Sequence, residues 1–110
     1  PRLVGLKRAK ELMLTNRVFT AQDAYEMGII DKVVEDNETL IEESEKQART
    51  FSKGPINAYS SVKKLLNKTF SCGLETQMEE ESLHISNNAQ SSNGKEGMLA
   101  FKEKRGPNFK

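Results

Sequence analysis

The chain has 110 residues, which is enough for at most one ordinary domain. With 35% hydrophobic and 30% charged residues, it has fewer core side chains than a globular domain usually carries. Its 17 basic and 16 acidic side chains give a formal net charge of +1, so no basic stripe is available to bind a nucleic-acid backbone. No apolar run approaches about 18 residues and no segment resembles a signal peptide, so we expect no membrane contact and a cytoplasmic location.

Few side chains are suited to catalysis or metal binding. The single cysteine, Cys72, and the single histidine, His84, exclude an internal disulfide, a multi-cysteine zinc site and most histidine-based designs, so we expect no metal site. We interpret Cys72 as an inert residue at a helix break and His84 as a surface histidine. The acidic run at 79–81 is interpreted as a solvated helix face, because adjacent residues of a helix point in different directions.

The first third of the chain predicts two helices and one extended segment. Good helix formers begin at residue 5 and the pattern fades at residues 15–16. Thr20 and Asp23 have the spacing of a capping box, which opens a short helix that ends before Gly28, a residue suited to a left-handed cap. The β-branched residues at 29–34 predict the only candidate strand, and one strand cannot form a sheet alone.

The rest of the chain predicts four helices, each with one apolar stripe. Asn37 is placed to cap the first of these, which ends at Gly54. The next spans about residues 56–69, a long one follows at 74–89, and a loop at 91–94 leads to the last helix at 95–105. The expected buried face of the first helix is Leu40, Ile41, Ser44, Ala48 and Phe51, the stripe of the second is Ile56, Tyr59, Val62, Leu66 and Phe70, and the spacing that outlines the third is that of Leu74, Met78, Glu81, Ile85 and Ala89. We therefore predict a mainly α fold that docks onto a partner surface.

Several short segments along the chain form a set of separated motifs. The chain opens with Pro-Arg-Leu-Val-Gly at 1–5, continues with Leu-Thr-Asn-Arg at 14–17 and has an Ala-X-X-X-Gly-Ile-Ile-Asp segment at 24–31. Its end at 96–109 reads Glu-Gly-X-X-Ala-Phe-X-Glu-Lys-Arg-X-Pro-X-Phe. In this order the segments resemble the enoyl-CoA hydratase/isomerase (crotonase) family, whose members close with the same pattern. Asn16 stands where the family usually has glycine, and asparagine tolerates a positive φ, so we expect that turn to survive.

The resemblance implies that the chain is the C-terminal helical region of a crotonase-like fold, with the end of the core at 1–36 and a helical oligomerisation region at 37–110. Family members are more than twice as long, and their oxyanion hole and catalytic carboxylates precede the position matching Pro1. We therefore assign no catalytic residue here and expect the chain alone to be inactive. The resemblance further implies a coenzyme A thioester as substrate, no tightly bound cofactor, and a homo-oligomer that is a trimer or a dimer of trimers.

The resemblance also implies a ligand role for the last helix, whose phenylalanine and lysine in the family reach the coenzyme A of a neighbouring subunit near its adenine and phosphate. The matching positions are Phe101 and Lys104. At i and i+3 of one helix they would share a face, where an aromatic ring and an ammonium group could meet an adenine and a phosphate together. Arg105 is adjacent and could share phosphate binding, but it lies about 100° away around the helix, so we rank it below Lys104 as a phosphate ligand.

Two alternatives remain open. In one, the chain is a standalone helical module that associates with itself through its apolar stripes and performs no chemistry. In the other, it is an acyl-CoA-binding helical domain in its own right.

Overall fold

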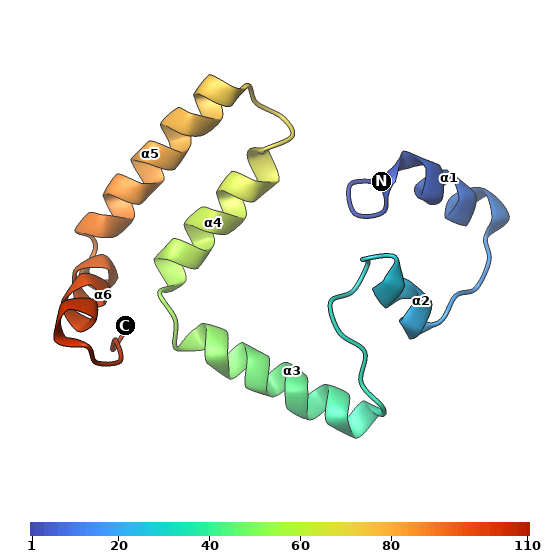
Figure 1. The fold of residues 1–110 in the computed structure, drawn as a ribbon, viewed down its shortest axis with the longest axis horizontal. Helices are drawn as coiled ribbons and strands as arrows, with labels where there is room; N and C mark the ends of the chain where they lie inside the picture. The colour runs from blue at the N-terminus through green and yellow to red at the C-terminus, as the bar shows by residue number, and fades with distance from the viewer. The chain divides into compact units, whose positions relative to one another are not determined.

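The computed structural model describes all 110 residues and contains six helices and no strand (Figure 1). The prediction of a mainly α fold is confirmed. The chain divides into two compact units, Pro1–Glu43 and Ser44–Lys110, which are described separately below. The division by function, between the end of the core at 1–36 and an oligomerisation region at 37–110, stays a prediction.

The first unit holds helices α1, Gly5–Thr15, and α2, Ala21–Glu26. The capping box is present: the Asp23 N–H donates to Thr20 Oγ1 at 3.1 Å, and the Thr20 N–H donates to Asp23 Oδ2 at 2.8 Å. The hydrogen bonds from the Thr20 N–H and hydroxyl lower the pKa of Asp23. Asn16, with φ 46°, and Gly28, with φ 72°, both adopt the left-handed conformation expected of them.

The segment at 29–34 forms no strand, because no second extended segment lies beside it to supply ladder hydrogen bonds. It connects α2 to α3, Asn37–Ser52. Lys32 Nζ lies 2.8 Å from Glu43 Oε2 and so ties the connection to the first part of that helix. The cap of α3 was predicted one residue too late: Asp36, not Asn37, accepts a hydrogen bond from the Thr39 N–H at 2.7 Å, and this bond lowers the pKa of Asp36.

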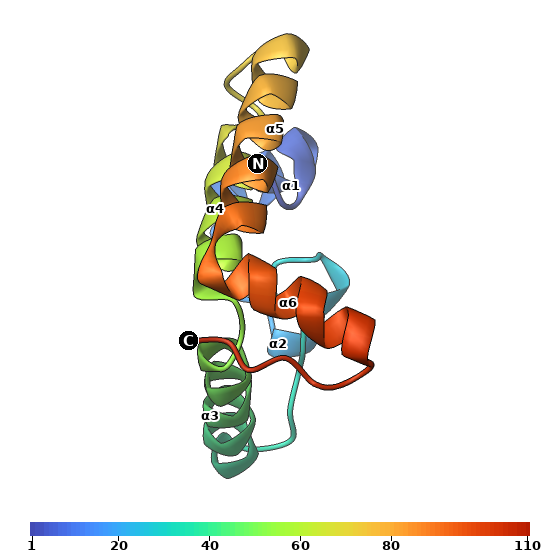
Figure 2. The ribbon, with the colours of Figure 1, turned by 90° about the vertical axis from the view of Figure 1, so that its left-hand side faces the viewer.

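The second unit contains the end of α3 and helices α4, Ile56–Lys68, α5, Leu74–Gln90, and α6, Ser92–Glu103. Helices α4 and α5 lie side by side as an antiparallel hairpin, and α5 also contacts α6 (Figures 1 and 2). The edge of the Phe51 ring meets the Tyr59 ring across the α3–α4 turn, with centroids 5.9 Å apart. The loop predicted at 91–94 is shorter than expected, because Ser91 Oγ accepts from the Gly94 N–H and caps α6.

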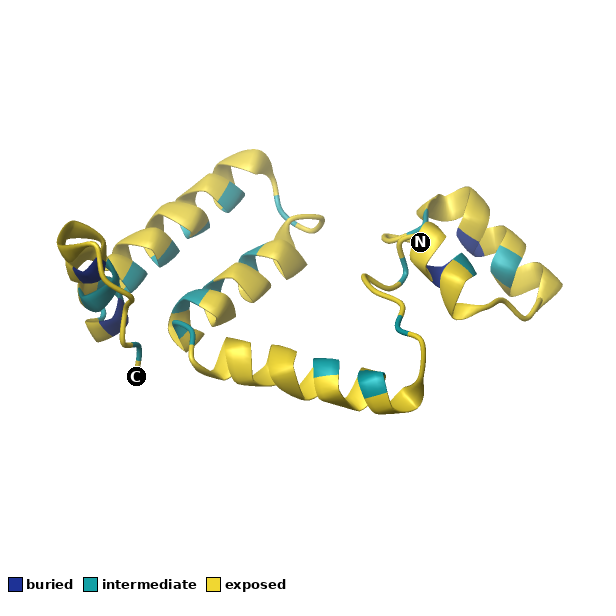
Figure 3. Cartoon of the chain, turned by 60° about the horizontal axis from the view of Figure 1, so that its bottom comes forward, coloured by how far each residue is buried: buried dark blue, intermediate teal, exposed yellow.

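Neither unit has a core of large side chains (Figure 3). Only Ala9, Ala24, Asn93 and Ala100 are buried, and no large hydrophobic side chain is enclosed. The apolar stripes are open in this chain: Phe51 is 53% exposed, Leu66 64% and Ile85 68%. No second layer of the chain covers them, and that they dock onto a partner surface stays a prediction. None of the helices has the length and apolar character needed to cross a membrane.

Candidate functional site

The candidate site lies at the end of α6, where Phe101 and Lys104 are three residues apart in the sequence. Phe101 is 88% exposed and belongs to the last turn of the helix. The helix ends at Glu103, and Lys104 has φ 53° and ψ 37°, which is the left-handed region. The Lys104 N–H donates to the Phe101 carbonyl at 3.2 Å, and the Arg105 N–H donates to the Ala100 carbonyl at 3.1 Å. These two bonds form a Schellman motif, in which the left-handed position is usually glycine.

An ion-pair cluster holds the chain just after this turn. Arg105 Nη1 and Nη2 donate to the two oxygens of Glu96 at 2.6 and 3.0 Å, and Arg105 Nε donates to Glu103 Oε2 at 2.6 Å. Glu96 Oε1 also accepts from the Asn108 N–H at 2.7 Å. The fork of the guanidinium matches the two carboxylate oxygens, which makes this a bidentate contact. A surface arginine is thereby fixed against the second and last turns of α6.

A second pair of hydrogen bonds fastens the end of the tail. Asn93 Nδ2 donates to the Lys110 carbonyl and the Lys110 N–H donates to Asn93 Oδ1, both at 2.9 Å. Residues 105–110 therefore run back along α6, as the ribbon after that helix shows in Figure 2. We call the bonds of Glu96 and Asn93 to residues 105–110 the clasp. Asn93, although polar, is buried because both ends of its amide are satisfied by the tail.

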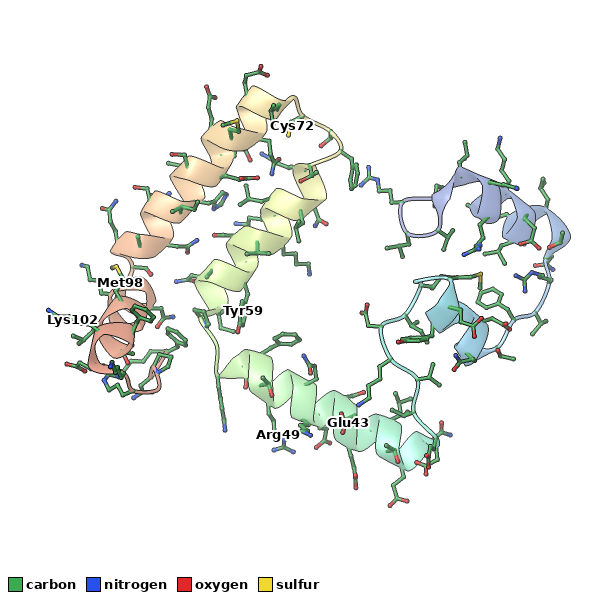
Figure 4. All side chains as sticks on the ribbon, in the orientation of Figure 1. Glu43, Arg49, Tyr59, Cys72, Met98 and Lys102 are labelled. Atoms are coloured by element: carbon green, nitrogen blue, oxygen red, sulfur yellow. The ribbon has the colours of Figure 1, made fainter.

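The tail also packs against α6 through an apolar contact. A Cβ added at Gly97 would meet the Phe109 ring at 3.6 Å, so glycine leaves room for that ring beside the helix. Phe109, Gly97 and Met98 line a pocket of about 320 Å³ with residues from the start of α4 and the end of α5. Met98 marks this side of α6 in Figure 4. Nothing charged lines the pocket, so we assign it no chemistry.

The clasp perturbs both of its charged members. The hydrogen bond from the Arg105 guanidinium, followed by that from the Asn108 N–H, lowers the pKa of Glu96 from 4.5 to about 2. The hydrogen bonds to Glu96 and then to Glu103 raise the pKa of Arg105 above its ordinary value. Both groups are therefore charged throughout the physiological range.

Comparisons with known proteins show the family of the chain. A family model described as enoyl-CoA hydratase/isomerase matches residues 1–110. The chain belongs to this family. Among curated relatives, a crotonyl-CoA hydratase from Syntrophomonas wolfei is 36% identical over 109 residues, which cover 99% of this chain and 42% of the relative. A 1,2-epoxyphenylacetyl-CoA isomerase from Escherichia coli is 33% identical, with 99% and 41% covered.

Solved structures of the enoyl-CoA hydratase/isomerase family agree with this assignment. An enoyl-CoA hydratase from Bacillus anthracis matches with a TM-score of 0.89 at 33% identity, over 100% of this chain and 42% of that one. An enoyl-CoA hydratase from Polaromonas sp. JS666 matches with a TM-score of 0.89 at 31% identity, over 99% of this chain and 42% of that one. The chain thus spans about two-fifths of the length of these relatives.

The structure changes the predicted geometry of the site in two respects. Phe101 and Lys104 do lie at the same helix end, but Lys104 is past the helix, so the i, i+3 relation of a continuous helix does not describe the pair. Arg105 is taken up by Glu96 and Glu103, which leaves it unsuited to bind a phosphate. The hydrogen bonds by which Glu96 and Asn93 hold the tail were not predicted. For Glu96 the signal was its place in the closing motif, and for Asn93 the sequence carried none.

Other chemistry-bearing side chains lie outside this site. His84 is half-buried rather than on the surface, because its Nδ1 lies 3.0 Å from the Ser61 hydroxyl across the α4–α5 hairpin. Cys72 lies in the α4–α5 turn (Figure 4), with its Sγ 3.3 Å from Gln77 Oε1. In the acidic run, Glu80 pairs with Lys68 at 2.5 Å and so joins the two helices. No group of three or more potential metal ligands occurs in the chain.

Proposed function

We propose that the chain is the C-terminal part of an acyl-CoA enzyme of the enoyl-CoA hydratase/isomerase family. In this role it packs against other subunits, closes the acyl pocket and contributes Phe101 and Lys104 to a coenzyme A site. The observation that carries the ligand role is the helix end itself: Phe101 is 88% exposed there, and the Lys104 ammonium takes no part in the ion pairs of Arg105 with Glu96 and Glu103. The names of the relatives, crotonyl-CoA hydratase among them, support a coenzyme A thioester as substrate.

The chemistry of the two side chains suits the nucleotide end of coenzyme A. An exposed phenyl ring offers a face on which an adenine stacks, a contact that contributes about 1–3 kcal/mol per base in nucleic-acid complexes. An ammonium group beside it attracts a phosphate as a point charge, without the geometric demands of a guanidinium. Both contacts lie far from a thioester carbonyl, so they provide binding and no acid–base chemistry.

Subunit packing is supported by the open apolar stripes of the second unit. Leu66, Met78 and Ile85 are each at least 60% exposed, although they recur at helical spacing on α4 and α5. Apolar faces of this extent are covered in a stable protein, and a trimer or a dimer of trimers would supply the cover. The oxyanion hole and the catalytic carboxylates would belong to the part of the protein before Pro1, as the resemblance to the family implies.

The test is a steady-state comparison in the whole protein with crotonyl-CoA as substrate. Phe101→Ala combined with Lys104→Ala is expected to raise KM about tenfold or more and to change kcat less than about twofold, because the lost contacts bind substrate and transition state equally. Lys102→Ala is the matched control, since Lys102 is an exposed lysine of the same helix (Figure 4). An unchanged KM in the double variant contradicts the ligand role.

The open stripes also favour a second candidate, a module that only associates with itself. Light scattering on the chain alone would then give a defined oligomer whose melting temperature does not respond to coenzyme A, since a ligand that binds the folded state must raise it. A melting temperature that rises with coenzyme A would favour the acyl-CoA role instead.

A further inference from the structure

The turn after α6 places a lysine where the backbone disfavours one. Lys104 has φ 53°, a conformation in which the Cβ of an L-residue crowds the following carbonyl and which glycine or asparagine adopts more readily. Gly106 is two residues farther on and has nothing near its Cβ position, so the glycine of this segment is not at the turn. Strained residues of this kind persist only where the surroundings fix them, and they cluster at functional sites.

The surroundings that fix Lys104 are the side chains on either side of it. Arg105 Nε donates to Glu103 Oε2 at 2.6 Å, so the residues immediately before and after Lys104 are bonded across it. The same guanidinium is anchored to Glu96, nine residues earlier in the first half of α6, by two hydrogen bonds of 2.6 and 3.0 Å. Arg105 Nη1 also donates to the Gly106 carbonyl at 3.1 Å. The turn is therefore held by Arg105 from three directions.

All three nitrogens of Arg105 are engaged in these bonds, whereas the Lys104 ammonium takes part in none of them. The two neighbouring cations therefore differ in role: Arg105 fixes the backbone, and the Lys104 ammonium is available to bind a ligand. We propose that Arg105 is a positioning residue, which binds Glu96 and Glu103 and thereby holds Lys104 in the left-handed turn that directs its ammonium to the phosphate of coenzyme A. This inference rests on the proposed function and adds to it the group that sets the geometry of the contact.

The experiment measures dissociation constants by isothermal titration calorimetry in the whole assembled protein, with coenzyme A and dephospho-coenzyme A as probes. The two probes differ by the phosphate on the adenosine ribose, so their ratio of dissociation constants isolates the phosphate contact. Lys104→Ala is expected to reduce the preference for coenzyme A about tenfold. Arg105→Ala is expected to reduce it to a similar extent, and Arg105→Ala added to Lys104→Ala should reduce it no further.

A merely structural role for Arg105 would give a different result. It would weaken both probes equally and leave their ratio unchanged, and this outcome overturns the inference. If Arg105→Ala fails to fold, Glu103→Gln replaces it, because that change weakens the bond across Lys104 and leaves the Glu96 pair in place; the same loss of preference is expected, and an unchanged ratio overturns the inference. Lys102→Ala is the control and should leave both dissociation constants unchanged.

A second substitution separates the turn from the side chain that it carries. Lys104→Gly removes the ammonium but relieves the left-handed backbone, so it should raise the melting temperature while losing the same preference as Lys104→Ala. Asn16→Gly is its matched control and should change neither quantity, since asparagine already tolerates a positive φ. A melting temperature lowered by Lys104→Gly overturns the inference. No loss of preference in either Lys104 variant contradicts the proposed function itself, whereas a loss there without one in Arg105→Ala contradicts the positioning role alone.

Discussion

Helices α1 and α6 both end at a left-handed residue that is followed by an arginine, and the two ends differ in how many hydrogen bonds hold them. Each is followed by a residue other than glycine in the left-handed conformation, Asn16 with φ 46° and Lys104 with φ 53°. In each case the next residue is an arginine that bonds back to a glutamate of the same helix. Arg17 Nε reaches Glu11 at 2.9 Å by one hydrogen bond, and its guanidinium also lies over the Phe19 ring.

The number of hydrogen bonds at each helix end depends on which residue occupies the left-handed position. Asn16 closes α1 with a single bond from its N–H to the Leu12 carbonyl at 3.1 Å, and asparagine accepts the conformation at little cost. A lysine pays roughly 1–2 kcal/mol for the same backbone. The α6 end accordingly has two cap bonds, a bidentate arginine and a tail held by the clasp. A disfavoured residue is thus kept in place by more bonds than a favoured one.

The largest expected effect tests how α6 begins. A Cβ at Gly94 would lie 2.0 Å from the Asn88 carbonyl oxygen, whereas Gly5 at the start of α1 has nothing within 4 Å. Gly94→Ala should therefore destabilise the protein by roughly 2–3 kcal/mol, because the obstacle is backbone that cannot swing aside. Urea unfolding followed by circular dichroism measures the change.

Gly97→Ala is the control for that substitution within the same helix. Its added methyl would lie 3.6 Å from the Phe109 ring, which is an ordinary contact, so stability should hardly change. Equal losses in the two variants would show that α6 tolerates no added volume anywhere and would remove the special status of Gly94.

The next largest effect is a loss of stability at low pH, where Glu96 becomes protonated. Glu96 has a folded-state pKa of about 2 against an ordinary value of 4.5, so its contribution to stability is complete above about pH 4.5 and is lost as the pH falls towards 2. Side-chain NMR should show the Glu96 carboxyl titrating near 2, and Glu96→Gln should abolish this part of the acid dependence. A titration near 4.5 would mean that the clasp is open in solution, which would erase the contrast between the two helix ends.

The smallest effect is expected at α1. Arg17 and Glu11 are more than 40% exposed, so their single ion pair should contribute about 0.5 kcal/mol or less. Arg17→Ala should shift the unfolding midpoint very little, and the shift should shrink further in high salt. A loss larger than that of Arg105→Ala would reverse the comparison.

Local sequence patterns predicted the helices and their ends well, because caps and turns are determined by residues within one helical turn of each other. The capping box of Thr20 and Asp23, the left-handed Gly28 and the survival of the turn at Asn16 all depend on neighbouring residues and are confirmed. The error at Asp36 is of the same local kind, since Asp36 and Asn37 are adjacent candidates for one cap. The start of α6 was predicted too late, because the polar run at 91–94 was interpreted as a loop.

Burial and the clasp could not be predicted in this way. Apolar spacing identifies a face but not what covers it, so it could not show how far Leu66 and Ile85 are exposed in this chain. The clasp joins Glu96 to Arg105 and Asn93 to Lys110 across a tail with no regular structure, and no periodicity encodes such pairs. Only the resemblance of the closing motif marked Glu96 and Arg105, and it gave no reason for them.

Two backbone amides of the tail report on its motion. Asn108 and Lys110 lie outside any helix, yet their N–H groups donate to Glu96 Oε1 at 2.7 Å and to Asn93 Oδ1 at 2.9 Å. Their hydrogen exchange requires only that the tail lift away, whereas the helical amides of α6 exchange when the helix itself opens. The rate at the two tail amides, set against that of α6, therefore measures how often the last residues leave the helix and return, one residue at a time.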